Sequence, residues 1–160
     1  AFGGTSLTSC IIPDNVISIG SSIFENCEFL ISATINCKSV SSKMFRNCKS
    51  FTELVLGKGV ETIAYDAFSN INVTMSSIKK HSIKTLISYA TTPPELSIYK
   101  SSTSGSGHEI SAFFIRKNYG SSPRFASYID EDAILYVPER CSDLYKKLWS
   151  SSFVNIIEMD

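Results

Sequence analysis

The chain of 160 residues carries few side chains that could do chemistry. His81 and His108 are its two histidines, and no Gly-x-Ser-x-Gly motif accompanies them. Asp130, Glu131 and Asp132 form an acidic run that could bind calcium weakly, although such a run is more typical of an exposed turn. We therefore expect no catalytic residue, no metal site and no cofactor.

The cysteines invite a disulfide or metal interpretation, but their spacing argues against both. The five are Cys10, Cys27, Cys37, Cys48 and Cys141. No Cys-x-x-Cys pair is present, and Cys10, Cys27 and Cys48 occupy repeat positions that other copies fill with small or apolar residues. We interpret these three as small buried hydrophobic residues. Cys27 and Cys48 should lie in neighbouring copies, where a bridge is conceivable.

Two sets of residues are suited to binding a protein. The first is a stripe of apolar, hydroxyl and carboxylate side chains that would point outward from one sheet: Ile11, Ser32, Thr34, Glu53, Val55 and Thr74. The second is an aromatic and arginine set of the kind found at binding hot spots: Phe113, Phe114, Arg116, Tyr119 and Arg124. The alternative for the first set is that β-favouring residues fill strand positions. The alternative for the second is that the rings cover the open end of the fold.

Internal repeats must position both sets. Phe2, Phe24, Phe45 and Phe68 recur at intervals of 22, 21 and 23 residues. A short alternating run follows each of them and predicts a strand: Cys10–Ile12, Ala33–Ile35, Leu54–Leu56 and Val73–Met75. One copy supplies roughly six apolar side chains, too few to close a core alone, so copies must stack and bury them in one column. Gly20–Phe24 and Ala64–Phe68 leave room for one or two turns of helix opposite the strands.

Several short motifs within these copies are specific. They include Leu30, Ala33 and Ile35 around one strand, the run Ile12–Gly20, and Phe24–Cys27. Together they resemble the BspA-like leucine-rich repeats of bacterial surface proteins, which also occur in some parasitic protists. Thr91–Leu96 and the stretch from Leu135 to Ile156 look like the closing segment of that family. The resemblance implies an α/β leucine-rich-repeat solenoid with a short parallel sheet on its concave face, short turns of helix and one C-terminal helix.

We expect one structural domain in three parts. Residues 1–96 would be the repeats, ending in a degenerate copy around Ile83 and Leu86. Residues 97–131 would be an insertion, either a cap or a binding loop, with Ser101–Gly107 as a flexible loop. We favour the cap, because terminal repeats need a covering element.

Residues 132–160 would be the closing segment. It should hold strands at 133–137 and 153–157 and a helix from Asp143 to Trp149. The helix should turn Leu144, Leu148 and Trp149 inward.

Charge narrows the class of partner. Fifteen basic and 15 acidic residues leave no net charge, so nucleic acid and anionic membrane are poor partners. No apolar run approaches the roughly 20 residues of a membrane span. The chain begins inside a repeat, and we expect a signal or anchor upstream of it.

We therefore predict a non-enzymatic, extracellular or cell-surface module that binds a protein. The resemblance implies adhesion to a host extracellular protein. One alternative is a structural spacer that displays another domain of a larger surface protein. A weaker alternative is an enzyme with a site in residues 97–131 around His108 or His81. The sequence leaves the oligomeric state open.

Overall fold

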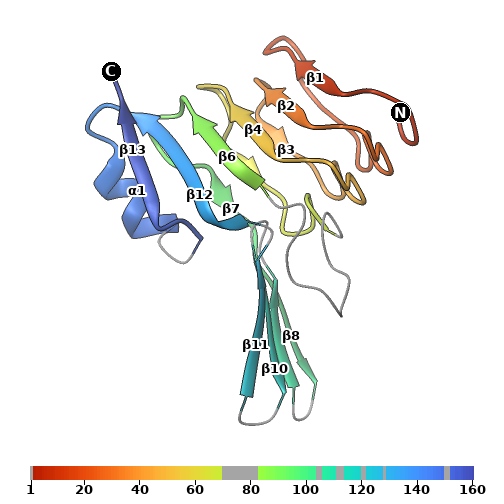
Figure 1. Cartoon of the computed structure of the whole chain (residues 1–160), viewed down its shortest axis with the longest axis vertical. Coiled ribbons are helices and arrows are strands. Elements are labelled where there is room, and N and C mark those ends of the chain that lie inside the picture. The colour runs from red at the N-terminus through yellow and green to blue at the C-terminus, as the bar shows by residue number, and fades with distance from the viewer. Residues whose placement is uncertain are drawn as a thin grey trace.

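The computed structural model describes residues 2–69, 83–103, 106–110, 114–119, 122–127, 129–149 and 152–160. Within them the chain forms thirteen strands and one helix. In chain order these are β1 (Ser9–Ile12), β2 (Ser32–Ile35), β3 (Ser39–Val40), β4 (Glu53–Leu56), β5 (Thr62–Ile63), β6 (Ile83–Ser88), β7 (Glu95–Leu96), β8 (Tyr99–Thr103), β9 (Ser106–Ile110), β10 (Phe114–Tyr119), β11 (Ser122–Ser127), β12 (Ile129–Pro138), α1 (Ser142–Trp149) and β13 (Asn155–Met159). Figure 1 shows the largest sheet with the two termini at opposite ends.

Six strands form this sheet, in the order β1-β2-β4-β6-β12-β13, and every pairing in it is parallel. Parallel neighbours need a crossover connection. Between β2 and β4 that crossover holds turns and the short strand β3. β3 pairs in parallel with β5, and β5 pairs in parallel with β7, so these three strands form a second, smaller sheet. The predicted parallel sheet and single C-terminal helix are confirmed.

The core lies between these two sheets and is organised by the repeated phenylalanines. The rings of Phe2 and Phe24 stack with centroids 5.7 Å apart, those of Phe24 and Phe45 at 5.7 Å, and those of Phe45 and Phe68 at 5.4 Å. Phe24, Phe45 and Phe68 are buried, whereas Phe2 is half exposed at the first copy. The alignment of copies by their phenylalanines is therefore confirmed, and the ring column joins the copies.

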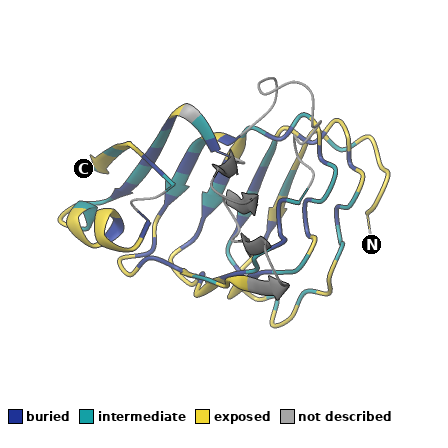
Figure 2. Cartoon of the chain, turned by 90° about the horizontal axis from the view of Figure 1, so that it is seen from below, coloured by how far each residue is buried: buried dark blue, intermediate teal, exposed yellow. Residues whose placement is uncertain are grey.

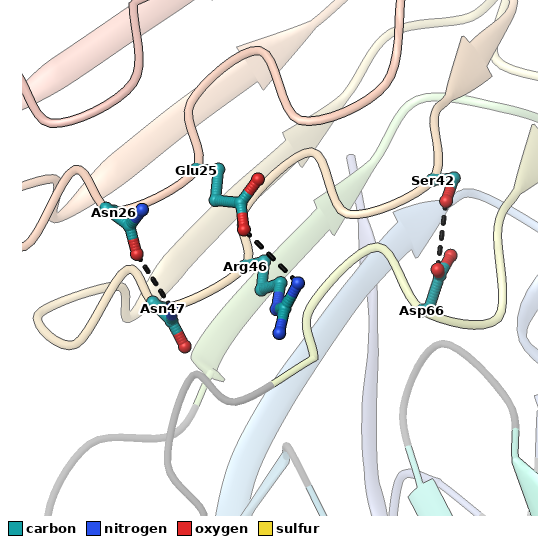
Figure 3. Close-up of polar contacts among 6 residues, drawn as sticks. All are labelled: Glu25, Asn26, Ser42, Arg46, Asn47 and Asp66. Atoms are coloured by element: carbon teal, nitrogen blue, oxygen red, sulfur yellow. Dashed lines mark hydrogen bonds and ion pairs between the residues drawn. The ribbon is translucent and has the colours of Figure 1, made fainter.

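The turns around the repeated phenylalanines, at residues 21–26, 42–47 and 65–69, contain no helix, contrary to the expectation of short helical turns. Asn26 and Asn47 have φ of 63° and 61°, and Ser22 and Lys43 have 58° and 54°. These left-handed residues interrupt a right-handed helix, and asparagine tolerates that conformation better than most residues. Figure 3 shows that the Asn47 side-chain amide also donates to Asn26 Oδ1 at 2.7 Å, which links successive turns.

The fourth copy departs from the prediction. The expected strand Val73–Met75 lies outside the described residues, and the neighbour of β4 is β6, from the copy expected to be degenerate. Val55 therefore pairs with Ile87, at the place that the sequence analysis assigned to Thr74.

The insertion contains a four-stranded antiparallel sheet in the order β11-β10-β9-β8. The expected flexible loop at Ser101–Gly107 is wrong at residues 101–103, 106 and 107, which lie in the paired strands β8 and β9, with Thr103 opposite Ser106. Residues 104 and 105 lie outside the described residues. Cross-strand pairing overrides the weak strand propensity of serine and glycine. In Figure 1 this sheet extends away from the six-stranded sheet, which β12 and β13 continue beyond β6. Whether the insertion caps the fold or binds a partner stays a prediction.

The helix α1 begins and ends close to the predicted bounds, but it buries a different face. Trp149 is buried as expected, whereas Leu144 and Leu148 are 39% and 54% exposed and Tyr145 is fully buried. The Tyr145 hydroxyl donates to the Ala90 carbonyl at 2.8 Å, and Trp149 Nε1 donates to the Pro94 carbonyl at 3.2 Å. These bonds orient the helix, because both polar tips would otherwise be buried without partners.

Removing one ring from the phenylalanine column should destabilise the fold strongly. Phe45 contacts Phe24, Phe51 and Phe68 and is fully buried, so Phe45→Ala should cost about 3–5 kcal/mol in urea unfolding. The control Ile17→Ala, at a side chain that is 94% exposed, should change stability by less than about 0.5 kcal/mol. Equal effects of the two substitutions would contradict the stacked column.

Stability should also depend on ionisation of Tyr145. Burial raises its pKa to about 12, against an ordinary value of about 10. Because the folded pKa is the higher one, the stabilisation is fully present below about pH 10 and is lost as the pH rises through about 12. Near neutral pH, Tyr145→Phe should cost about 1–3 kcal/mol, because it leaves the Ala90 carbonyl without this donor.

The stability difference between wild type and Tyr145→Phe should therefore narrow when urea unfolding is repeated near pH 11. A difference that stays constant between about pH 8 and 11 would contradict the assigned role of the hydroxyl.

Candidate functional site

The face of the six-stranded sheet that points away from the core carries two rows of side chains, which we call the outer face. Strand register places the first row, which we call the outer row, across all six strands: Ile11, Thr34, Val55, Ile87, Tyr136 and Ile157. The second row lies beside it: Ser9, Ser32, Glu53, Thr85, Ile134 and Asn155. Successive residues of a strand point to opposite faces, and Figure 2 shows the resulting alternation of burial along the strands.

The structure brings five of the six predicted stripe residues onto this face. Ile11, Thr34 and Val55 are direct neighbours on adjacent strands, and Ser32 and Glu53 are neighbours in the second row. Thr74 lies outside the described residues.

Sequence analysis missed Ile87, Tyr136 and Ile157, which extend the first row over β6, β12 and β13. The alternation within residues 83–88 and 133–137 was the signal that could have identified two of them.

The first row of the outer face is largely apolar, the second row is mostly polar, and the two rows together are nearly uncharged. Ile11 and Ile157 are 72% and 45% exposed, and Thr34, Val55 and Tyr136 are partly exposed. Glu53 is the one charged residue among the twelve of the two rows. Such a surface can exclude water against a complementary partner.

Charged pairs between copies lie in the connections between the strands of this sheet. Arg46 pairs with Glu25 at 3.3 Å in the turns, as Figure 3 shows, and Lys38 pairs with Glu61 at 3.2 Å. Lys49 pairs with Glu28 in the same way. All three join one copy to the next, and exposed pairs of this kind contribute little stability. They leave the outer face free of ion pairs among the residues that the structure describes.

The second predicted set lies in the other sheet. Phe114, Arg116 and Tyr119 belong to β10 and Arg124 belongs to β11, where its Cα partner is Lys117. Phe113 lies outside the described residues. The two predicted sets therefore occupy separate sheets and do not form one surface by strand pairing.

The cysteines are free thiols. Cys27 and Cys48 are buried, as interpreted from the sequence, whereas Cys10 is only partly buried. Cys37 is buried as well, although no burial was predicted for it. Cys27 Sγ donates to the Phe2 carbonyl at 3.0 Å, and Cys48 Sγ donates to the Phe24 carbonyl at 3.2 Å. Each thiol thus bonds to the copy before it. Burial, with a smaller contribution from the neighbouring Cys27, raises the pKa of the Cys48 thiol to about 12. The Cys27 and Cys48 thiols therefore link successive turns by hydrogen bonds.

The histidines and acidic side chains are not gathered into a site by the part of the chain that is described. His108 lies in β9 opposite Lys117, and His81 falls outside that part. The described residues include no cluster of three or more His, Cys, Asp or Glu side chains that could hold a metal ion. They also include no helix that is long and apolar enough to cross a membrane.

Comparison with known proteins gives one match. The family model described as a BspA-type leucine-rich-repeat region of six copies matches residues 1–92. Comparison with curated proteins and with solved structures gave no significant match. The match covers more than half of the chain and includes β1, β2, β4 and β6, the first four strands of the outer face.

Thiol labelling tests the placement of the cysteines. Cys48 is fully buried and its pKa is raised, so iodoacetamide near pH 8 should leave it unmodified in the native chain. Cys141, which is partly exposed, should be labelled first and serves as the internal control. Peptide mass spectrometry would follow both sites with time. Labelling of Cys48 as fast as Cys141 would contradict the buried position.

Proposed function

Because the chain belongs to the BspA-type leucine-rich-repeat family, we propose that it is a non-enzymatic binding module that holds a protein ligand on its outer face. Repeats of this family are commonly surface protein-binding modules. The observation that carries the proposal is the row of Ile11, Thr34, Val55, Ile87, Tyr136 and Ile157, which runs without interruption across six strands.

The physical basis is a large surface that is ordered before binding. Adjacent strands lie roughly 4.8 Å apart, so a row across six strands is about 24 Å long. This length approaches the edge of roughly 28 Å of a square patch of about 800 Å², which is the area that a standard protein interface buries on each partner. Its side chains stand on strands of one sheet, four of which are paired on both sides, so binding orders few of them and costs little conformational entropy.

We further propose that the repeats form a solenoid with the outer face on its concave side, and that the chain acts outside the cell by adhesion to a host protein. Contacts across the predicted boundaries support the proposal that 1–96, 97–131 and 132–160 are parts of one structural domain. Ser88 lies 2.6 Å from the Tyr145 hydroxyl, and Trp149 bonds to Pro94. Tyr99 in the insertion stacks on Tyr65 with centroids 5.4 Å apart.

Thr34→Arg should abolish capture of the ligand without unfolding the chain. The side chain lies on β2, between Ile11 and Val55 in the row, and is partly exposed, so arginine can reach solvent while blocking an apolar partner. The matched control is Thr62→Arg, an exposed threonine on β5 of the small sheet. Binding would be measured by surface plasmon resonance on a panel of purified extracellular-matrix proteins.

We expect at least one matrix protein to bind wild type and Thr62→Arg alike and to bind Thr34→Arg at least tenfold more weakly, about 1.4 kcal/mol. Circular dichroism would check that both variants fold. If no matrix protein binds, the spacer role becomes the better account. Equal weakening by both substitutions would contradict the outer face as the binding surface.

A further inference from the structure

The same face ends in a cavity of about 370 Å³, which is lined by residues outside the two rows. Its apolar walls are Tyr89, Pro138 and Met159. Its polar lining consists of Lys58, Thr91, Glu139 and Asp160. Small-molecule sites in proteins have volumes of roughly 300–1,000 Å³ and combine apolar walls with a few polar groups, so this cavity has the size and the lining of a ligand site.

Strand register explains why these residues meet. Tyr89, Pro138 and Met159 each lie two residues after a member of the outer row, so they continue the outer face. Pro138 and Met159 are Cα partners, and the Tyr89 N–H bonds to the Leu56 carbonyl at 2.9 Å. Figure 1 shows β6, β12 and β13 ending at one edge of the sheet, close to the C-terminal end.

Gly57, which directly follows β4, leaves the neighbouring position free of a side chain. A Cβ atom there would lie 2.3 Å from Asn36 Oδ1 and 3.1 Å from Asn36 Cα, which is too close for any larger residue. The chain then turns, with the Val60 N–H bonded to the Gly57 carbonyl at 3.3 Å, and Lys58 is exposed on that turn. Beside Tyr89, the cavity is therefore lined by the long, exposed side chain of Lys58 and not by a packed side chain at position 57.

The charges around the cavity nearly balance. Lys58 brings one positive charge, and Glu139 and Asp160 bring two negative ones. Arg140 Nε lies 3.3 Å from Glu139 Oε1 and offsets one of these. A balanced site gives little net attraction to an anion or a cation. It instead offers carboxylate acceptors, an ammonium donor and the Thr91 hydroxyl to a neutral molecule with several hydroxyl groups.

We propose that this cavity binds a neutral hexose ring, as the free sugar or as part of a glycan. The Tyr89 ring is 46% exposed and can stack on the apolar C–H face of a pyranose. Glu139 and Asp160 accept hydrogen bonds from sugar hydroxyls, and the Lys58 ammonium group donates hydrogen bonds to sugar oxygens. This site is independent of the proposed protein ligand, since Thr34 and Val55 do not line it.

The test is saturation-transfer NMR of the whole chain with the methyl glycosides of glucose, galactose, mannose and N-acetylglucosamine. We expect at least one to receive saturation at its ring C–H protons. Tyr89→Phe should keep this signal, because the stacking surface stays, and Tyr89→Ala should weaken binding at least tenfold. The matched control is Tyr99→Ala, which removes a tyrosine of similar exposure, 47%, on β8.

Three results would overturn the proposal: no saturation of any of the four glycosides, an unchanged signal in Tyr89→Ala, or equal loss in Tyr99→Ala. Binding of glucuronate or sialic acid in preference to the neutral sugars would also overturn it, because it would require a basic site. Thr34→Arg should leave the sugar signal unchanged. The sugar site and the protein-binding face can therefore fail separately.

Discussion

Stacking of one repeat on the next is the interaction on which the structure depends. A single copy presents one or two phenylalanines and a four-residue strand, which cannot enclose an apolar core in water. When copies stack, the rings of Phe24, Phe45 and Phe68 cover one another and become buried. Backbone bonds follow the same register, because the Phe24 N–H bonds to the Met44 carbonyl and the Phe45 N–H to the Ala67 carbonyl. The strands and turns of the repeats follow this same spacing.

Several polar groups in the turns are satisfied by the same device, although Asp66 Oδ1 is buried without a hydrogen-bond partner. A turn without a helix leaves backbone and side-chain polar groups that need partners. Here they find them one copy away, through the amide of Asn47, the thiols of Cys27 and Cys48, and the Ser42 hydroxyl, which donates to Asp66 at 2.9 Å. Figure 3 shows three such contacts in successive turns. The core and the turns are consequently complete without the side chains of the outer face.

Local pattern was sufficient where the repeat is regular. The phenylalanine interval and the alternating runs predicted β1, β2 and β4, and the apolar spacing predicted α1. Pattern failed where long-range contacts decide the outcome. The pairing of β4 with β6 depends on which strand follows in space, and a period does not determine that. The buried face of α1 depends on bonds from Tyr145 and Trp149 to residues 55 positions earlier, which no helical wheel contains. The serine and glycine residues of β8 and β9 adopt strand conformation because each strand pairs with the other.

The continuity of the outer row from β4 to β6 is the step on which the proposed binding face rests, and a nuclear Overhauser experiment on methyl-labelled protein would test it most directly. Val55 and Ile87 are partners on adjacent parallel strands, so their methyl groups should lie within roughly 5 Å and give a strong cross-peak. The same spectrum should connect Val55 to Thr34 on the other side. A cross-peak from Val55 to Thr74 in place of Ile87 would contradict the account, because Thr74 and not Ile87 would then lie beside Val55 in the row.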